Sequence, residues 1–213
     1  MSRRLPLFPL PDVVLLPGTL LPLHVFEARY RAMVADALAG DRTIGMTMLL
    51  PGSDPAASAP PIHQVGTAGE IVESEGLPDG RYNIVLEARF RFRVVAEDAP
   101  APYRVARVEE IPTASFREPG EEERLVASAM DLFGDVARAL ELPPLPRETL
   151  APERLASELA LRLRFSPAEL QSLLETDSLP SRFEQLRGRM LEWKSRLHFL
   201  APFRPKDLDP RQN

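Results

Sequence analysis

The sequence of 213 residues contains no cysteine. Disulfide scaffolds, thiolate metal sites and cysteine nucleophiles are therefore excluded, and a chain without disulfides suits a reducing compartment. No stretch approaches the roughly 18 consecutive apolar residues that a membrane-spanning helix needs. Prolines and the charge of Asp12 interrupt the apolar N-terminus, which argues against a signal peptide. We expect a cytoplasmic protein that does not enter a membrane.

Lysine is scarce, because only Lys194 and Lys206 occur among the 26 lysines and arginines. Neither lysine follows a glycine, so the chain lacks the Gly-Lys-Ser/Thr loop that holds nucleotide phosphates. Lys194 and Ser195 are neighbours on a predicted helix, where adjacent side chains point about 100° apart. This arrangement argues against a serine–lysine catalytic pair.

The three histidines, His24, His63 and His198, have no partner motif. There is no Gly-x-Ser-x-Gly turn for serine–histidine catalysis and no histidine spacing typical of a metal site. We therefore predict that the protein is not an enzyme and has no catalytic residue, no metal site and no cofactor.

The periodicity of apolar residues divides the chain into two parts. Short apolar runs broken by proline predict strands as far as Ile111, with one amphipathic helix over 27–38. Beyond this point apolar residues recur at spacings of three and four, which predicts helices. We expect the α+β class, with a strand-rich module over 1–115, a helical module over 116–204 and a flexible tail over 205–213.

Two further predictions concern single elements, a short strand and the start of a helix. The apolar run over 13–16 predicts a short strand, because proline and glycine follow it directly. Ser166, Pro167 and Glu169 predict a helix start with a capping box and proline in the first turn.

Arg89, Arg91 and Arg93 are the candidate binding residues, since they lie two apart in a strictly alternating strand and share one face. Such a stripe could hold phosphates or peptide carboxylates through forked hydrogen bonds. Alternatively, the face is solvated and balanced by glutamates such as Glu87. The net charge of −5 favours the second interpretation and makes nucleic acid an unlikely partner.

The last predicted helix, over 180–200, carries a long apolar seam. Its residues are spaced alternately by three and four: Phe183, Leu186, Met190, Trp193, Leu197 and Leu200. A seam of this kind usually packs on its own bundle, but it could also pair with a second copy of the chain. A dimer through this helix is therefore one open alternative for the oligomeric state.

Several short motifs occur in a fixed order. They are LPLFPL at 5–10, VVLLPG at 13–18, LPLHVFEARY at 21–30, VGTAGEI at 65–71, LPDGRY at 77–82, RFRV at 91–94 and LQSLLETD at 170–177. Together they resemble the N-terminal, substrate-binding domain of Lon proteases. The version with Phe-Glu-x-Arg-Tyr is most similar to free-standing bacterial relatives that lack the ATPase and protease domains.

The resemblance implies a PUA-like β-barrel with one inserted helix, followed by an all-helical bundle. It also implies recognition of unfolded or exposed protein and peptide segments. The expected function is a non-catalytic binding module, an adaptor or chaperone-like factor in protein quality control that works with a separate protease or chaperone. The alternative function is RNA binding by the barrel through the arginine face.

Overall fold

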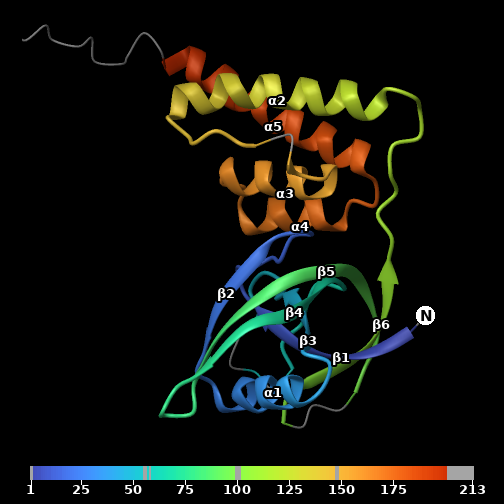
Figure 1. Cartoon of the computed structure of the whole chain (residues 1–213), viewed down its shortest axis with the longest axis vertical. Helices are drawn as coiled ribbons and strands as arrows, with labels where there is room; N and C mark the ends of the chain where they lie inside the picture. The colour runs from blue at the N-terminus through green and yellow to red at the C-terminus, as the bar shows by residue number, and fades with distance from the viewer. Residues whose placement is uncertain (1, 55–56, 58, 99–101, 147–148, 201–213) are drawn as a thin grey trace, which may run out of the picture.

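The computed structural model describes residues 2–54, 57, 59–98, 102–146 and 149–200. Figure 1 shows a β-barrel at one end of the molecule and a bundle of helices at the other. The elements follow in the order β1 (Ser2–Leu10), β2 (Leu20–Val25), α1 (Ala28–Ala39), β3 (Thr43–Met48), β4 (Val65–Gly76), β5 (Tyr82–Glu97), β6 (Arg104–Ile111), α2 (Glu121–Leu140), α3 (Pro152–Arg162), α4 (Pro167–Glu175) and α5 (Leu179–Leu200).

Six strands form one mixed sheet in the order β2-β5-β4-β3-β1-β6. β1 and β3 run parallel, and the other neighbouring strands are antiparallel. β5 has 16 residues and is long enough to pair with β2 in its first half and with β6 in its second half. The β5–β6 pairing closes the sheet into a barrel and leaves β2 as an edge strand. The predicted α+β class with a strand-rich barrel and one inserted helix is confirmed.

Two apolar clusters fill the barrel. α1 supplies Tyr30 and Met33 to the first cluster, so the predicted apolar face of this helix is buried. The second cluster surrounds Phe92, which is fully buried. Gly66 lies opposite Phe92 on β4, and a Cβ atom at Gly66 would come within 2.3 Å of the carbonyl oxygen of Met46. The barrel wall therefore requires glycine at this point.

The C-terminal module is a bundle of four helices around one apolar cluster. α3 and α4 lie between the barrel and the α2–α5 pair (Figure 1). Phe183, Leu186 and Met190 of α5 are fully buried, so this part of the predicted seam packs on its own bundle. A dimer through α5 stays a prediction. The predicted capping box is confirmed, because the Ser166 hydroxyl accepts from the Glu169 N–H and the Glu169 carboxylate accepts from the Ser166 N–H at 2.7 Å.

The two modules meet along an irregular segment near residue 16. The predicted strand over 13–16 is wrong, because this segment crosses the junction and pairs with none of the described strands. Leu15 packs into the barrel core, whereas Leu16 packs into the helical core. In α3, the buried hydroxyl of Ser157 donates to the carbonyl oxygen of Pro17 at 2.8 Å. Apolar packing and a buried hydrogen bond thus hold the helices on the barrel.

The connection between the modules runs from Ile111 to Glu121. The expected boundary at 115 falls inside this segment, whose residue Ala114 forms an isolated bridge with Ser178. The domain limits at 1–115 and 116–204 stay a prediction, and the tail over 205–213 lies outside the described residues. Within the described ranges, no helix has the length and apolar character that crossing a membrane would demand.

Candidate functional site

Arg91 lies in the interior, where the end of α4 packs over β5. Its side chain is 1% exposed. The guanidinium donates to the carbonyl oxygens of Leu174 at 2.7 Å and Pro112 at 3.1 Å. A positive charge is favourable here, because the last carbonyls of a helix lack intrahelical partners and carry partial negative charge. The prediction that Arg91 shares one exposed face with Arg89 and Arg93 is therefore wrong.

A second buried arginine, Arg182 of α5, completes this junction. Its Nε donates to the carbonyl oxygen of Thr176 at 3.0 Å, and its Nη1 pairs with Glu153 at 3.1 Å. Burial and then the charge of Arg91 lower the pKa of Arg182 to about 10, so it stays protonated at neutral pH. The Arg182 side chain is 2% exposed, so a ligand in solution reaches neither guanidinium. Arg91 joins the barrel to the end of α4, and Arg182 joins α5 to α3 and to the residue after α4.

Arg89 and Arg93 are exposed. Arg89 sits between Glu70 and Glu87, with a distance of 2.8 Å from its Nη2 to each carboxylate. The predicted balance by Glu87 is thus confirmed for Arg89. Because Arg91 is buried and Arg89 is neutralised, the three arginines form no continuous cationic stripe. A binding role for Arg89 or Arg93 stays a prediction.

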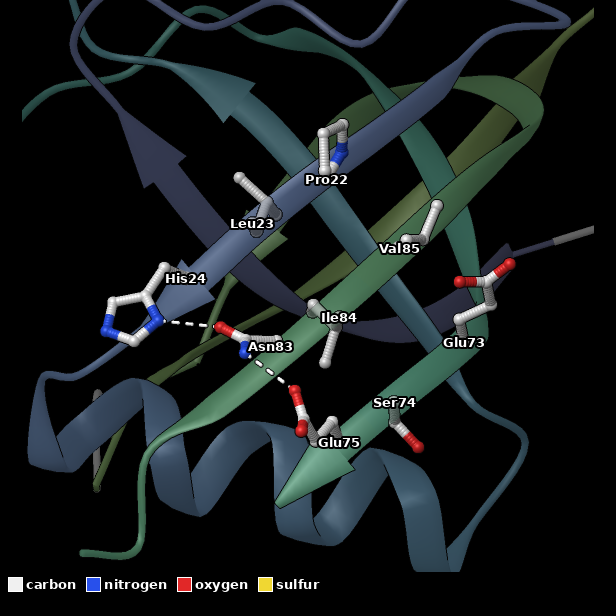
Figure 2. A pocket seen from close by; sticks show the side chains of 9 residues that line it. All are labelled: Pro22, Leu23, His24, Glu73, Ser74, Glu75, Asn83, Ile84 and Val85. Atoms are coloured by element: carbon white, nitrogen blue, oxygen red, sulfur yellow. Dashed lines mark hydrogen bonds between the residues drawn. The ribbon is translucent and has the colours of Figure 1, made fainter. Parts of the chain in front are cut away.

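The first half of β5 lies between β2 and β4 and has an outer surface open to solvent, called here the open face. The strand register places six side chains in two rows across it: Pro22, Val85 and Glu73 in one, and His24, Asn83 and Glu75 in the other. Figure 2 shows both rows lining a pocket, which has a volume of about 510 Å³. Apolar side chains lie toward β2 and the centre of this pocket, and carboxylates lie along β4.

A chain of hydrogen bonds crosses the open face. The guanidinium of Arg81 contacts Nε2 of His24 at 3.2 Å, and Nδ1 of His24 lies 2.8 Å from Oδ1 of Asn83. The amide of Asn83 then donates to Glu75 at 2.8 Å (Figure 2). Arg81 can only donate, so the contacts are satisfied together when His24 carries its proton on Nδ1. This series of hydrogen bonds orients the carboxylate of Glu75. Asp79, whose pKa is lowered chiefly by the backbone N–H of Arg81, holds the guanidinium at 2.6 Å.

The edge strand β2 adds exposed apolar surface beside the pocket. Leu20 is 58% exposed, and Phe26, just beyond the end of the strand, is 62% exposed. The backbone N–H of Ala88 donates to the carbonyl oxygen of Thr19 at 3.0 Å. Antiparallel alternation therefore directs the backbone of Pro22 toward the free edge. Because proline has no N–H, this edge lacks one donor of the ladder and is a poor template for another strand.

The remaining histidine and lysine side chains of the described residues that form ion pairs lie away from the open face. Nδ1 of His63 lies 3.0 Å from Glu175, which joins the start of β4 to α4. Lys194 is paired with Asp135 at 2.7 Å. In the part of the chain that the structure describes, no three histidine or acidic side chains gather in a way that could hold a metal ion. The open face offers a partner apolar contact, carboxylates and hydrogen-bonding groups.

Sequence reasoning missed the residues of this pocket. The alternation of Pro22 with His24, and of Glu73 with Glu75, is visible in the sequence and places each pair on one face of its strand. The sequence does not reveal the register between strands, and the register brings Val85 between the two pairs.

The comparisons with known proteins define the class of this chain. A family model described as "ATP-dependent protease La (LON) substrate-binding domain" matches residues 4–191. The chain therefore belongs to the family of Lon substrate-binding domains. It is 32% identical to the Lon protease of Dictyoglomus thermophilum over 190 residues, which are 85% of this chain and 23% of that protein. It is 28% identical to the Lon protease of Flavobacterium johnsoniae, with 98% of this chain and 27% of that protein covered. The chain thus spans about a quarter of the length of these relatives.

Solved structures show the same fold. A Lon N-terminal domain protein from Xanthomonas campestris matches with a TM-score of 0.63 and 28% identity, covering 86% of this chain and 96% of that one. The N-terminal domain of the Mycobacterium avium complex Lon protease matches with a TM-score of 0.69 and 20% identity, covering 91% of this chain and 98% of that one. The region shared with the relatives is the non-catalytic N-terminal domain.

Proposed function

We propose that this chain is a non-catalytic module that captures exposed apolar segments of unfolded proteins on its open face. Membership of a substrate-binding family supports binding to protein in general. The observation that carries the proposal is the pocket around Pro22 and Val85, together with the exposed side chains of Leu20 and Phe26, which precede and follow its β2 residues in the chain. Apolar surface left in contact with water at one edge of a barrel gains free energy when a partner covers it.

Binding energies indicate how much of the face a partner must cover. Micromolar affinity corresponds to about 8 kcal/mol, and complete burial of one large apolar side chain contributes about 1.5 to 3 kcal/mol. Because ordering a flexible segment opposes binding, several anchors are needed. A segment that fills the pocket and also covers Leu20 and Phe26 supplies them. We propose that the protein acts on such segments as an adaptor or chaperone-like factor, together with a separate protease or chaperone.

The proposal is tested with the double variant Leu20→Ser/Phe26→Ser and a short apolar peptide labelled for fluorescence anisotropy. Both side chains are more than half exposed, so we expect the fold to persist, with thermal unfolding as the check. The peptide should bind wild-type protein with micromolar affinity and the variant at least about tenfold more weakly, a loss of about 1.4 kcal/mol. The control is Leu191→Ser on α5, which removes a side chain that is 50% exposed on the helical module. Equal affinities for wild type and the double variant would contradict the proposed site.

A further inference from the structure

We infer that the open-face pocket selects segments in which an apolar residue stands next to arginine or lysine, and that Glu73 and Glu75 set this preference. The inference rests on the proposed function and names the class of segment that the same pocket takes. It follows from the placement of charge around an apolar centre.

The geometry puts the two carboxylates on one side of the pocket. Glu73 and Glu75 are two residues apart on β4 and point to the same face, while Pro22 lies on the opposite side, on β2 (Figure 2). Val85 of β5 lies between them. Adjacent strands are about 4.8 Å apart, so the apolar and acidic sides are separated by about 10 Å. A segment that places an apolar side chain on Pro22 and Val85 therefore brings its neighbouring side chain to the carboxylates.

The charges of this region are unbalanced. Residues 70–89 contain five carboxylates and two arginines, and Arg31 and Arg42 reach this segment from outside it, where they donate to the carbonyl oxygens of Asp79 and Ile71. Arg89 is occupied by Glu70 and Glu87, and Arg81 is occupied by Asp79. Among the described residues, neither Glu73 nor Glu75 has a cationic partner. A cation brought by the bound segment supplies the missing charge, whereas an acidic segment is repelled.

The two carboxylates differ in how firmly they are held. Asn83 donates to one oxygen of Glu75, and His24 holds Asn83 in turn, so this carboxylate is oriented before a ligand arrives. Glu73 has no hydrogen-bond partner among the described residues. Preorganisation reduces the entropy lost on binding, so Glu75 should contribute more to the preference than Glu73.

The expected size of the preference follows from the exposure of both groups. Exposed ion pairs stabilise weakly, which corresponds to about a two- to fivefold change in affinity for each pair. Two such pairs give about tenfold discrimination between a basic and a neutral segment. Because the groups are exposed, added salt should reduce the preference.

The experiment uses the whole chain and three labelled peptides of the pattern Ser-Leu-Phe-X-Leu-Ser, with arginine, glutamine or glutamate at X. Wild-type protein should bind the arginine peptide about tenfold more tightly than the glutamine peptide, and the glutamate peptide most weakly. In the isosteric variant Glu73→Gln/Glu75→Gln, the three affinities should converge while the glutamine peptide still binds. The control variant Glu109→Gln/Glu110→Gln removes two exposed carboxylates from β6 and should keep the wild-type preference.

The outcomes separate this inference from the proposed function. If wild type binds all three peptides equally, or if the Glu73→Gln/Glu75→Gln variant keeps the full preference, the inference is overturned while apolar capture stands. If both double variants lose the preference equally, the effect is that of net charge and the inference is overturned. If none of the peptides binds wild type, the proposed function fails and the inference fails with it.

Discussion

The two halves of β5 carry a similar alternation of side chains but have different surroundings. In the second half, the end of α4 covers Arg91, whose side chain is 1% exposed and bonded to carbonyl oxygens of the helical module. In the first half, Arg89 is 43% exposed and is held by two glutamates at the surface. The difference arises from what packs over each half. One strand can therefore join the two modules at one end and present the proposed binding face at the other.

The largest expected change in stability comes from substituting Arg91, in the half of β5 that α4 covers. Arg91→Ala leaves the buried carbonyl oxygen of Leu174 without its donor and removes the part-buried bond to Pro112, while it relieves the repulsion between Arg91 and Arg182. An unsatisfied buried carbonyl costs about 1 to 3 kcal/mol and an ordinary hydrogen bond contributes about 1 kcal/mol, so the free energy of unfolding should fall by about 2 to 4 kcal/mol. Urea unfolding measures this change.

The matched control is Arg93→Ala on the same strand. Arg93 is exposed and has no ion-pair partner among the described residues, so its removal should change the free energy of unfolding by less than about 0.5 kcal/mol. If both substitutions had the same effect, the covered and open arginines would not differ as the structure indicates.

A second test compares two glycines of β4, one opposite each half of β5. A Cβ atom at Gly66 would lie 2.3 Å from a backbone oxygen and 2.8 Å from the ring of Phe92. At Gly76 the nearest atom is in the ring of Tyr82, at 3.7 Å, which is an ordinary contact. Gly66→Ala should therefore destabilise the protein by about 1 to 3 kcal/mol, and Gly76→Ala should have little effect. Thermal unfolding distinguishes them, and a tolerated alanine at 66 would show that the barrel wall yields.

The sequence predicts the elements better than their surroundings. The alternation over 89–93 correctly indicates a strand, and the spacing in α5 correctly indicates a seam buried in its own bundle. The burial of Arg91 was not predictable, because it depends on Leu174, which lies 83 residues away in the chain. Strand alternation specifies which side chains share a face and leaves open what covers that face.

The candidate site was less predictable than the fold, for a related reason. Its residues come from three strands, and Pro22, Val85 and Glu73 meet only through the register of two strand pairs. The segment over 13–16 shows the converse case: its apolar run suggests a strand, although Leu15 and Leu16 pack into different cores. Local pattern carries no information about which module an apolar side chain enters.

A smaller change in stability is expected at Ser157 of α3, which lies where the helices meet the barrel. Ser157→Ala removes the buried hydrogen bond to the carbonyl oxygen of Pro17 and should lower the free energy of unfolding by about 1 kcal/mol. Ser172 lies in a neighbouring helix and is exposed, so Ser172→Ala changes helix propensity in the same way without a buried bond. Urea unfolding of both variants gives the difference. Equal results would mean that water replaces the bond at the junction.

The smallest expected change in stability comes from an exposed carboxylate, and it tests whether hydrogen bonds at the surface contribute without burial. Glu121, in the first turn of α2, accepts from the backbone N–H groups of Arg117 at 2.8 Å and Glu118 at 3.3 Å, which lowers its pKa from the ordinary value of 4.5. A lowered folded pKa stabilises the protein above the unfolded pKa, and this contribution is lost as the pH falls through the folded pKa. Glu121→Gln should therefore be slightly less stable than wild type at pH 7, and the difference should shrink below about pH 4.5. Glu122→Gln removes a charge from the same turn without these two bonds, so its difference from wild type should be smaller. Urea unfolding across this pH range measures both, and identical profiles for the two variants would show that the helix dipole alone accounts for the effect.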